Sequence, residues 1–238
     1  MNRIGFSYLV NPVDPVLSHF VRSSGMLRHV FIAWTVLSAV TGAIAAESVV
    51  FEDDFSDGVE RWEVLDPATW RLNDDGTFEI TARESAYKPP HRSPLHVALV
   101  KDVTVGDMAI EFRVKSTLDT GSHRDCCVFF GWQDPAHFYY VHLGALPDAA
   151  SGQIQLVDGA DRRPLTANKR PVPWTDGWHT VRLERHPATG RIAVYFDDLT
   201  TPLMETTDTT LGAGRVGIGS FDDCDAFDDV RVLDGSTK

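Results

Sequence analysis

Apolar and polar residues alternate along most of the chain after residue 47. In the segment 108–116, MAIEFRVKS, every second residue is apolar, and the segment 190–198, GRIAVYFDD, repeats the pattern. A period of two predicts strands that bury one face. The same alternation predicts further strands at 77–82, 96–100, 153–157, 179–185 and 215–220. No window carries a helical stripe.

Short strands joined by Gly, Pro and Asp turns, with no alternation of strands and helices, predict two stacked antiparallel sheets. We therefore expect an all-β protein, and a jelly-roll sandwich fits the length of the chain. The sequence after residue 46 shows no linker, repeat or low-complexity tract. One domain, 47–238, is the simplest interpretation.

Two hairpins can be placed, one through the turn 134–137 and one through the turn 187–190. In the first we expect Trp132 to lie opposite Tyr139. One face then belongs to the core and carries Cys126, Val128, Phe130, Trp132, Tyr139, Val141 and Leu143. The other face mixes aromatic, polar and small residues as a groove does, with Cys127, Phe129, Gly131, Tyr140, His142 and Gly144.

The first 46 residues read as a targeting segment. Arg28 and His29 precede an apolar run at 30–40, and Ala43-Ile44-Ala45 is a small-x-small cleavage signal, so residues 1–46 are predicted to be a signal peptide. Translation starting at Met26 is an alternative, because that segment is complete without the residues before it. The apolar run is shorter than a membrane span, and no second run follows. We expect a secreted or periplasmic protein.

The 238 residues carry a formal net charge of −12 and are 43% hydrophobic, as expected for a folded domain. An acidic surface argues against nucleic acid or an anionic membrane as the main partner. Three cysteines, Cys126, Cys127 and Cys224, reach an oxidising compartment on this interpretation. One bridge between Cys224 and one of the other two is one expectation, and three buried thiols is the other.

Four segments carry a resemblance to the concanavalin A-like lectin and glucanase superfamily, which includes laminin G and thrombospondin N-terminal modules. They are FEDDFSDGVERWEV, VFFGWQDPAHFYYVHL, WHTVRLERHPATGRIAVYFDD and GRVGIGSFDDCDAFDDVRV. The resemblance implies a concanavalin-like jelly-roll sandwich of two antiparallel sheets, with glycans on its concave sheet. It also implies, in many members, a structural calcium ion where the first and last strands meet. The fold alone does not decide the activity.

The glucanases of this superfamily use a Glu-x-Asp-x-Glu strand, and this sequence has no such pattern. The carboxylates that match the calcium position are Asp53 and Asp54 near the start and Asp228 near the end. Calcium prefers several hard oxygen ligands, and five aspartates within 222–229 would repel one another without a cation. The alternative is that these aspartates serve as turn residues and strand-edge charges.

A second group is basic and aromatic, and consists of His91, Arg92, His123, Arg124, Tyr140 and His142. If these residues meet on the concave sheet, the arginines suit a sugar carboxylate or sulfate. The same residue types suit β-elimination, with His142 as base and Tyr140 as acid. The alternative is that each makes only local contacts.

These observations leave three functional hypotheses. The first is a calcium-stabilised domain that binds a poly- or oligosaccharide, an acidic one included. The second is a polysaccharide lyase or atypical glycosidase acting on the same face. The third is a laminin G-like module for protein adhesion. The sequence does not identify the glycan, the cysteine pairing or the oligomeric state.

Overall fold

The computed structural model describes residues 48–118 and 121–235, which belong to one compact unit, 43–238. The predicted signal peptide, residues 1–46 with Met26, lies outside the described residues. No helix among the described residues is long and apolar enough to cross a membrane.

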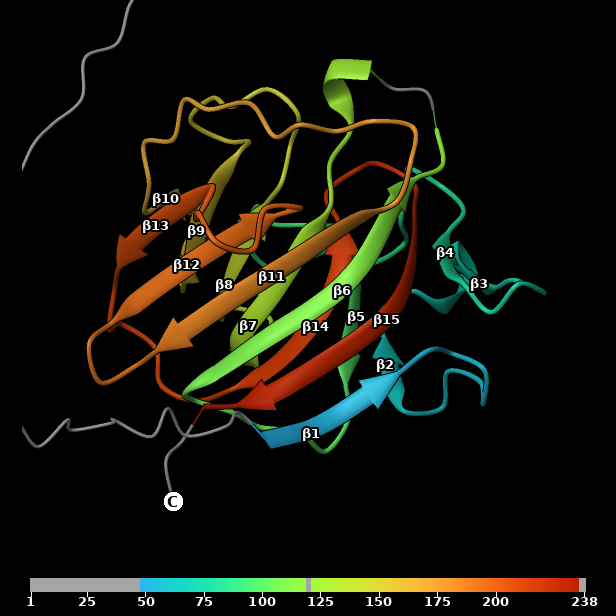
Figure 1. Cartoon of the computed structure of the whole chain (residues 1–238), viewed down its shortest axis with the longest axis horizontal. Helices are drawn as coiled ribbons and strands as arrows, with labels where there is room; N and C mark the ends of the chain where they lie inside the picture. The colour runs from blue at the N-terminus through green and yellow to red at the C-terminus, as the bar shows by residue number, and fades with distance from the viewer. Residues whose placement is uncertain (1–47, 119–120, 236–238) are drawn as a thin grey trace, which may run out of the picture. The chain divides into compact units, whose positions relative to one another are not determined.

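The described chain forms two antiparallel sheets, as predicted (Figure 1). The eight-stranded sheet has the order β13 (Met204–Thr207), β12 (Arg191–Phe196), β11 (His179–His186), β6 (Met108–Ser116), β15 (Asp225–Asp234), β4 (Phe78–Ile80) and β3 (Trp70–Leu72), and β1 (Ser48–Asp53) also pairs with β15. The seven-stranded sheet has the order β10 (Arg163–Pro164), β9 (Gln153–Asp158), β8 (His137–His142), β7 (Cys127–Asp134), β14 (Arg215–Ser220), β5 (His96–Val100) and β2 (Trp62–Val64). The short 3-10 helices are η1 (Pro67–Thr69) and η2 (Gly121–His123).

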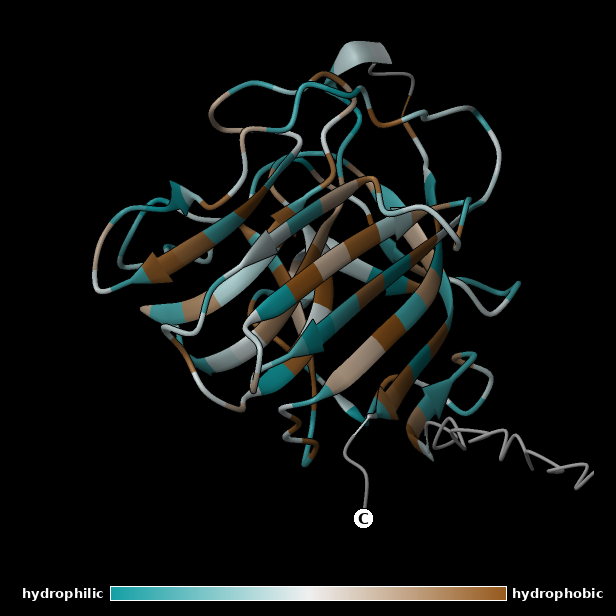
Figure 2. Ribbon diagram, turned by 60° about the vertical axis from the view of Figure 1, so that its left-hand side comes forward, coloured by the Kyte–Doolittle hydropathy of each residue, from teal (hydrophilic) through white to brown (hydrophobic). Residues whose placement is uncertain are grey.

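The core lies between the two sheets because the alternation turns every second side chain inward. Figure 2 shows this alternation as hydrophobic and hydrophilic bands along the strands. On β6, Ile110, Phe112 and Val114 are completely buried in the interior cluster, while Glu111 and Arg113 on the other face are partly exposed. The predicted strand at 108–116 and the hairpin through 187–190 are confirmed.

The three cysteines are buried free thiols, which is the second of the two expectations. Cys126 and Cys224 belong to the interior cluster, whereas Cys127 faces the opposite side of its sheet. Burial raises the pKa of Cys224 to about 11, so its thiolate is scarce at neutral pH.

Candidate functional site

The hairpin of β7 and β8 differs from its predicted register. Phe130 pairs with Tyr139 and Asp134 pairs with His137, with an irregularity between them. Gly131 lies in that irregularity at φ +55°, a conformation that glycine adopts readily. The expected pairing of Trp132 with Tyr139 is therefore wrong. The irregularity turns Trp132 away from the interior, and a Cβ on Gly131 would meet Tyr139 and Arg185 and not the outer face predicted for that glycine. The predicted faces of the remaining apolar residues of this hairpin are confirmed.

Trp132 joins a second apolar cluster on the outer face of the seven-stranded sheet, the face opposite the interior. We call it the outer aromatic cluster, and it consists of Val97, Leu99, Cys127, Phe129, Trp132, Phe138, Tyr140 and Val157. Leu65, Tyr87 and Phe221 pack against it, and Tyr140 is 0% and His142 6% exposed. The face predicted as a groove is thus largely filled by side chains from neighbouring loops.

His142 forms a buried pair with Asp125 on this face. Its Nε2 lies 3.4 Å from Asp125 Oδ2, and its Nδ1 lies 2.9 Å from the carbonyl oxygen of Ala150. Both ring nitrogens of His142 therefore face acceptors. Burial opposes ionisation of Asp125, but the charge of His142 and hydrogen bonds hold the pKa of this carboxyl below its ordinary value.

Phe221, which follows β14, covers this pair. Its ring stacks on His142 with centroids 5.4 Å apart, and its backbone N–H donates to Asp125 Oδ1 at 3.0 Å. The guanidinium carbons of Arg162 and Arg92 lie 4.3 and 5.8 Å from the Phe221 ring centroid. We call Arg92, Arg162, Phe221, Tyr140 and His142 the Phe221 site.

The two arginines of the Phe221 site form no ion pair with a carboxylate within the described residues. Arg162 donates to the hydroxyl of Tyr140 at 3.1 Å, and the backbone N–H of Arg92 donates to Asp161 at 2.9 Å. Arginines on the other sheet are paired differently. Acidic and basic residues alternate there along one row of cross-strand pairs through β1, β15, β6 and β11. The row consists of Glu52, Arg231, Glu111 and Arg182. The Phe221 site thus holds guanidinium groups whose charge is not matched locally by a carboxylate contact.

The structure brings together three of the six predicted ligand residues, Arg92, Tyr140 and His142. His91 is half-buried beside Arg92, and His123 is exposed on η2. Arg124 points elsewhere and pairs with Asp176 at 2.5 Å. There it lines a cleft of about 490 Å³ together with half-buried Trp178, which directly precedes β11.

Sequence reasoning missed Phe221 and Arg162. Phe221 lies between a strand and an aspartate-rich segment, and Arg162 lies in the polar turn after β9. The available signal was the Asp161-Arg162-Arg163 run in an otherwise acidic protein, but nothing in the strand pattern connects it to Arg92.

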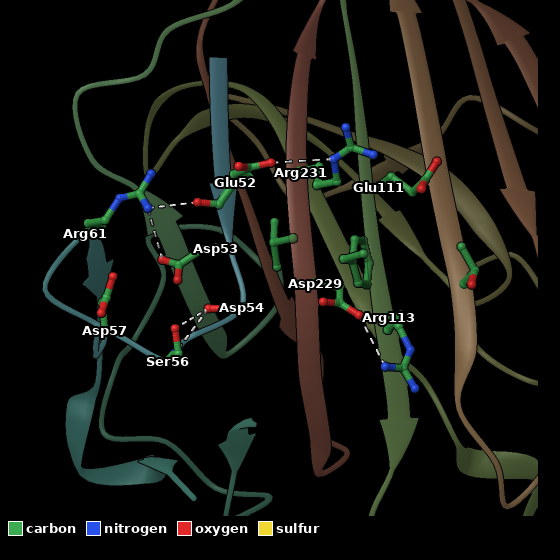
Figure 3. A pocket seen from close by; sticks show the side chains of 13 residues that line it. Glu52, Asp53, Asp54, Ser56, Asp57, Arg61, Glu111, Arg113, Asp229 and Arg231 are labelled. Carbon is green, nitrogen blue, oxygen red and sulfur yellow. Dashed lines mark hydrogen bonds and ion pairs between the residues drawn. The ribbon is translucent and has the colours of Figure 1, made fainter. Parts of the chain in front are cut away.

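The predicted calcium residues lie where β1 meets β15. A hollow of about 770 Å³ opens here and is lined by Asp53, Asp54, Asp229, Arg113 and neighbouring residues (Figure 3). Asp53 is engaged in the fold, because its oxygens accept from the Phe55 N–H and from Trp62 Nε1, both at 2.9 Å.

Two other carboxylates at this edge, those of Asp228 and Asp229, share one arginine. Arg113 lies 3.4 Å from Asp228 and 3.2 Å from Asp229. Burial raises the pKa of Asp228, and the charges of Asp229 and Asp54 add to the effect. No group of three or more His, Cys, Asp or Glu side chains in the described ranges is arranged to hold a metal ion. Calcium binding stays a prediction.

The geometry of Tyr140 and His142 is unsuited to proton transfer with a ligand, because both side chains are buried. His142 has both nitrogens engaged, and burial raises the pKa of Tyr140 well above its ordinary value. A general acid or base must reach the substrate proton and change its charge near the working pH. The exposed Arg92 and the partly exposed Arg162 and Phe221 are the groups of this site that a ligand can reach directly.

Comparison with solved structures agrees with the architecture. The carbohydrate-binding module CBM66 from Bacillus subtilis superposes with a TM-score of 0.55 and 15% identity, over 73% of this chain and 95% of the module. The Emp47p carbohydrate recognition domain gives a TM-score of 0.55 and 12% identity, over 80% and 97%. A Bacillus subtilis protein of unknown function with a galectin-like fold gives 0.52 and 12%, over 79% and 97%.

The chain has the concanavalin A-like jelly-roll fold. No protein-family model matches the sequence, and no curated protein matches it. At these identities the likeness concerns the fold alone.

Proposed function

We propose that this protein is an exported carbohydrate-binding domain that holds a poly- or oligosaccharide at the Phe221 site. The observation that carries the proposal is the pair of guanidinium groups around one partly exposed aromatic ring, without carboxylate partners in the described residues. The guanidinium groups lie over the Phe221 ring, which holds them in place by cation–π contact, and their N–H groups can donate directional hydrogen bonds to a ligand. Two of the similar folds are described as carbohydrate-binding.

The arginines favour an acidic saccharide. A planar guanidinium binds carboxylate or sulfate through two parallel hydrogen bonds. The protein has a net charge of −12, so a local basic site is required to hold an anionic ligand against general repulsion. A uronate-rich or sulfated glycan fits this requirement better than a neutral one.

Binding to a panel of neutral, uronate-containing and sulfated polysaccharides tests the proposal. The purified protein is compared with Arg92→Ala/Arg162→Ala and with Arg163→Ala, which alters an exposed neighbouring arginine. Hydrogen bonds to charged groups contribute about 1.5–3 kcal/mol each, so the double variant should lose at least about tenfold in affinity. Arg163→Ala should bind like the wild type.

The same incubations are followed for reducing ends and unsaturated uronate. Binding without product supports the proposal. Turnover of any substrate would replace it by the lyase or glycosidase hypothesis. Equal affinity of the double variant and the wild type would remove the Phe221 site from the explanation, and silence across the panel would favour protein adhesion.

A further inference from the structure

Asp225, the first residue of β15, has an unusual environment. Its side chain is completely buried, and neither carboxyl oxygen has a hydrogen-bond partner within the described residues. It pairs in register with Ser116 on β6, a position that is also buried. The hydroxyl of Ser220, which lies beside it, donates instead to Asp125 at 2.9 Å. An ionised carboxylate in such a place would lack the compensation that buried charges require.

Among the described residues, the charged groups that act on Asp225 are carboxyls. The buried His96 on β5 lies near Asp125, and its ring nitrogens are 3.2 Å from the Thr69 hydroxyl and from the Arg83 carbonyl oxygen. Asp125 precedes β7, Asp223 lies in the loop before β15, and both carry carboxyls. The buried thiols of Cys126, Cys127 and Cys224 also face this region. His142 on β8 is engaged by Asp125, and Arg83 is engaged by Asp222 at the surface. Burial raises the pKa of Asp225 well above its ordinary value, and the two neighbouring carboxyls add to the effect.

The same carboxyls anchor the loop 220–225, which carries Phe221. Asp125 accepts from the Ser220 hydroxyl and the Phe221 N–H, at 2.9 and 3.0 Å. Asp223 accepts from the Ser116 hydroxyl at 3.0 Å. The position of Phe221 over His142 therefore depends on a loop that is held by buried carboxyl groups.

We propose that Asp125, Asp223 and Asp225 form a proton-dependent latch beneath the Phe221 site, closed when Asp225 carries its proton and released when that proton is lost. Loss of the proton adds a negative charge beside the carboxyls of Asp125 and Asp223 in a buried space. The charge must be hydrated, and hydration requires the loop 220–225 to open and Phe221 to leave His142. This regulation rests on the proposed saccharide site, but the latch itself does not.

The direction of the pH dependence follows from linkage. Because the folded chain binds the Asp225 proton more tightly than the unfolded chain, its stabilisation is complete below the ordinary carboxyl pKa. It is lost progressively as pH rises and is exhausted above the pKa of the folded state. Between the ordinary carboxyl pKa and the raised pKa of the folded state, loss of the Asp225 proton lowers the folding equilibrium constant about tenfold for each unit of pH increase.

Unfolding by denaturant from pH 5 to pH 9, without ligand, tests the latch. The free energy of unfolding of the wild type should fall with rising pH with the slope expected for one proton. Asp225→Asn should lack this pH dependence, because its amide is uncharged at every pH. Asp74→Asn, which alters an exposed aspartate in a turn, should follow the wild type. Equal slopes in wild type and Asp225→Asn would overturn the proposal. If Asp225→Asn does not fold, the pH dependence of wild-type stability is the test, and a free energy of unfolding that does not change with pH would overturn the proposal.

Two further measurements complete the test. If millimolar calcium removes the pH dependence of the wild type, a cation and not a proton neutralises the cluster, and the proposal is overturned. Affinity for whichever saccharide binds should fall with rising pH in the wild type and not in Asp225→Asn. If stability falls with the slope of one proton but saccharide affinity does not change with pH, the latch exists and the proposal that it regulates the Phe221 site is overturned. If no saccharide binds, the stability profile still decides the latch, and only the proposed function fails.

Discussion

The Oδ2 atom of Asp125 lies 3.4 Å from Nε2 of His142, and the two side chains are 5% and 8% exposed. The pair joins the strand that precedes the hairpin turn to the strand that follows it, since Asp125 lies just before β7 and His142 ends β8. Phe221 covers it from a third segment. A charge pair in this position organises the Phe221 site without reaching a ligand itself.

Removing His142 should destabilise the protein and not merely weaken binding. Breaking a buried pair leaves an uncompensated charge, which costs about 3–5 kcal/mol. We expect His142→Gln to lower the free energy of unfolding at pH 7 by about 3 kcal/mol, measured by denaturant titration. His137→Gln, a more exposed histidine near Asp134, should change it little. A His142→Gln protein as stable as the wild type would contradict the buried pair.

Protonation of Asp125 at low pH should also break the pair with His142. The pKa of Asp125 is lowered in the folded chain, so its contribution to stability is present above the ordinary carboxyl pKa and is lost as pH falls through the folded value. The expected outcome is a loss of stability below about pH 4 that is smaller in Asp125→Asn. Thermal unfolding from pH 2 to pH 5 measures it, and parallel curves for the two proteins would be the contrary result.

The alternation of residues was sufficient to predict the strands and their faces, but not a local change of register. On β7 the predicted faces hold from Cys127 to Phe130 and fail at Trp132. The failure has one cause, because Gly131 adopts a positive φ where two residues of β7, 130 and 131, stand against one residue of β14. Nothing in a period-two pattern shows which glycine will do so.

Gly131 should be intolerant of a side chain. A Cβ atom there would lie 2.6 Å from Nη1 of Arg185 and 3.2 Å from Cδ2 of Tyr139. Gly159 has a similar φ of +64°, but a Cβ there meets nothing closer than His137 Nε2 at 3.8 Å. We expect Gly159→Ala to cost about 1 kcal/mol from backbone strain alone and Gly131→Ala at least about 1 kcal/mol more from crowding. Denaturant titration of both variants gives the comparison, and equal costs would mean that the close approach to Arg185 is unimportant.

The Phe221 site was only partly predictable for a different reason. Tyr140 and His142 lie on a strand, where sequence spacing fixes which face they share. Arg92, Arg162 and Phe221 lie in loops, and their meeting depends on contacts between segments far apart in the chain. For a similar reason, the burial of Asp225 was not predicted. A run of aspartates near a strand indicates a solvated edge, and only the fold shows that one of them is buried.

Calcium should stabilise the edge where β1 meets β15. Asp54, Asp228 and Asp229 repel one another there, with Arg113 close to the last two. Figure 3 shows Asp54 and Asp229 on opposite sides of the hollow. A bound ion at a hundredfold excess over Kd adds about 2.7 kcal/mol of stability. We expect calcium to raise the Tm of the wild type and of Asp134→Asn, but not of Asp228→Asn. An unchanged Tm in all three proteins would remove calcium from the description.

Thiol titration separates the two expectations for the cysteines. The structure contains three free thiols, and burial raises the pKa of Cys126 and Cys127 well above the ordinary value. Because a thiol reacts as its thiolate, we expect almost no reaction in the native protein at pH 8 and three equivalents after denaturation without reductant. One equivalent after denaturation would instead indicate a bridge, and Cys126 would be the first partner to test for Cys224, since both belong to the interior cluster. A bridge at that point would also tie β7 to the loop before β15, and so would constrain the segment that carries Phe221.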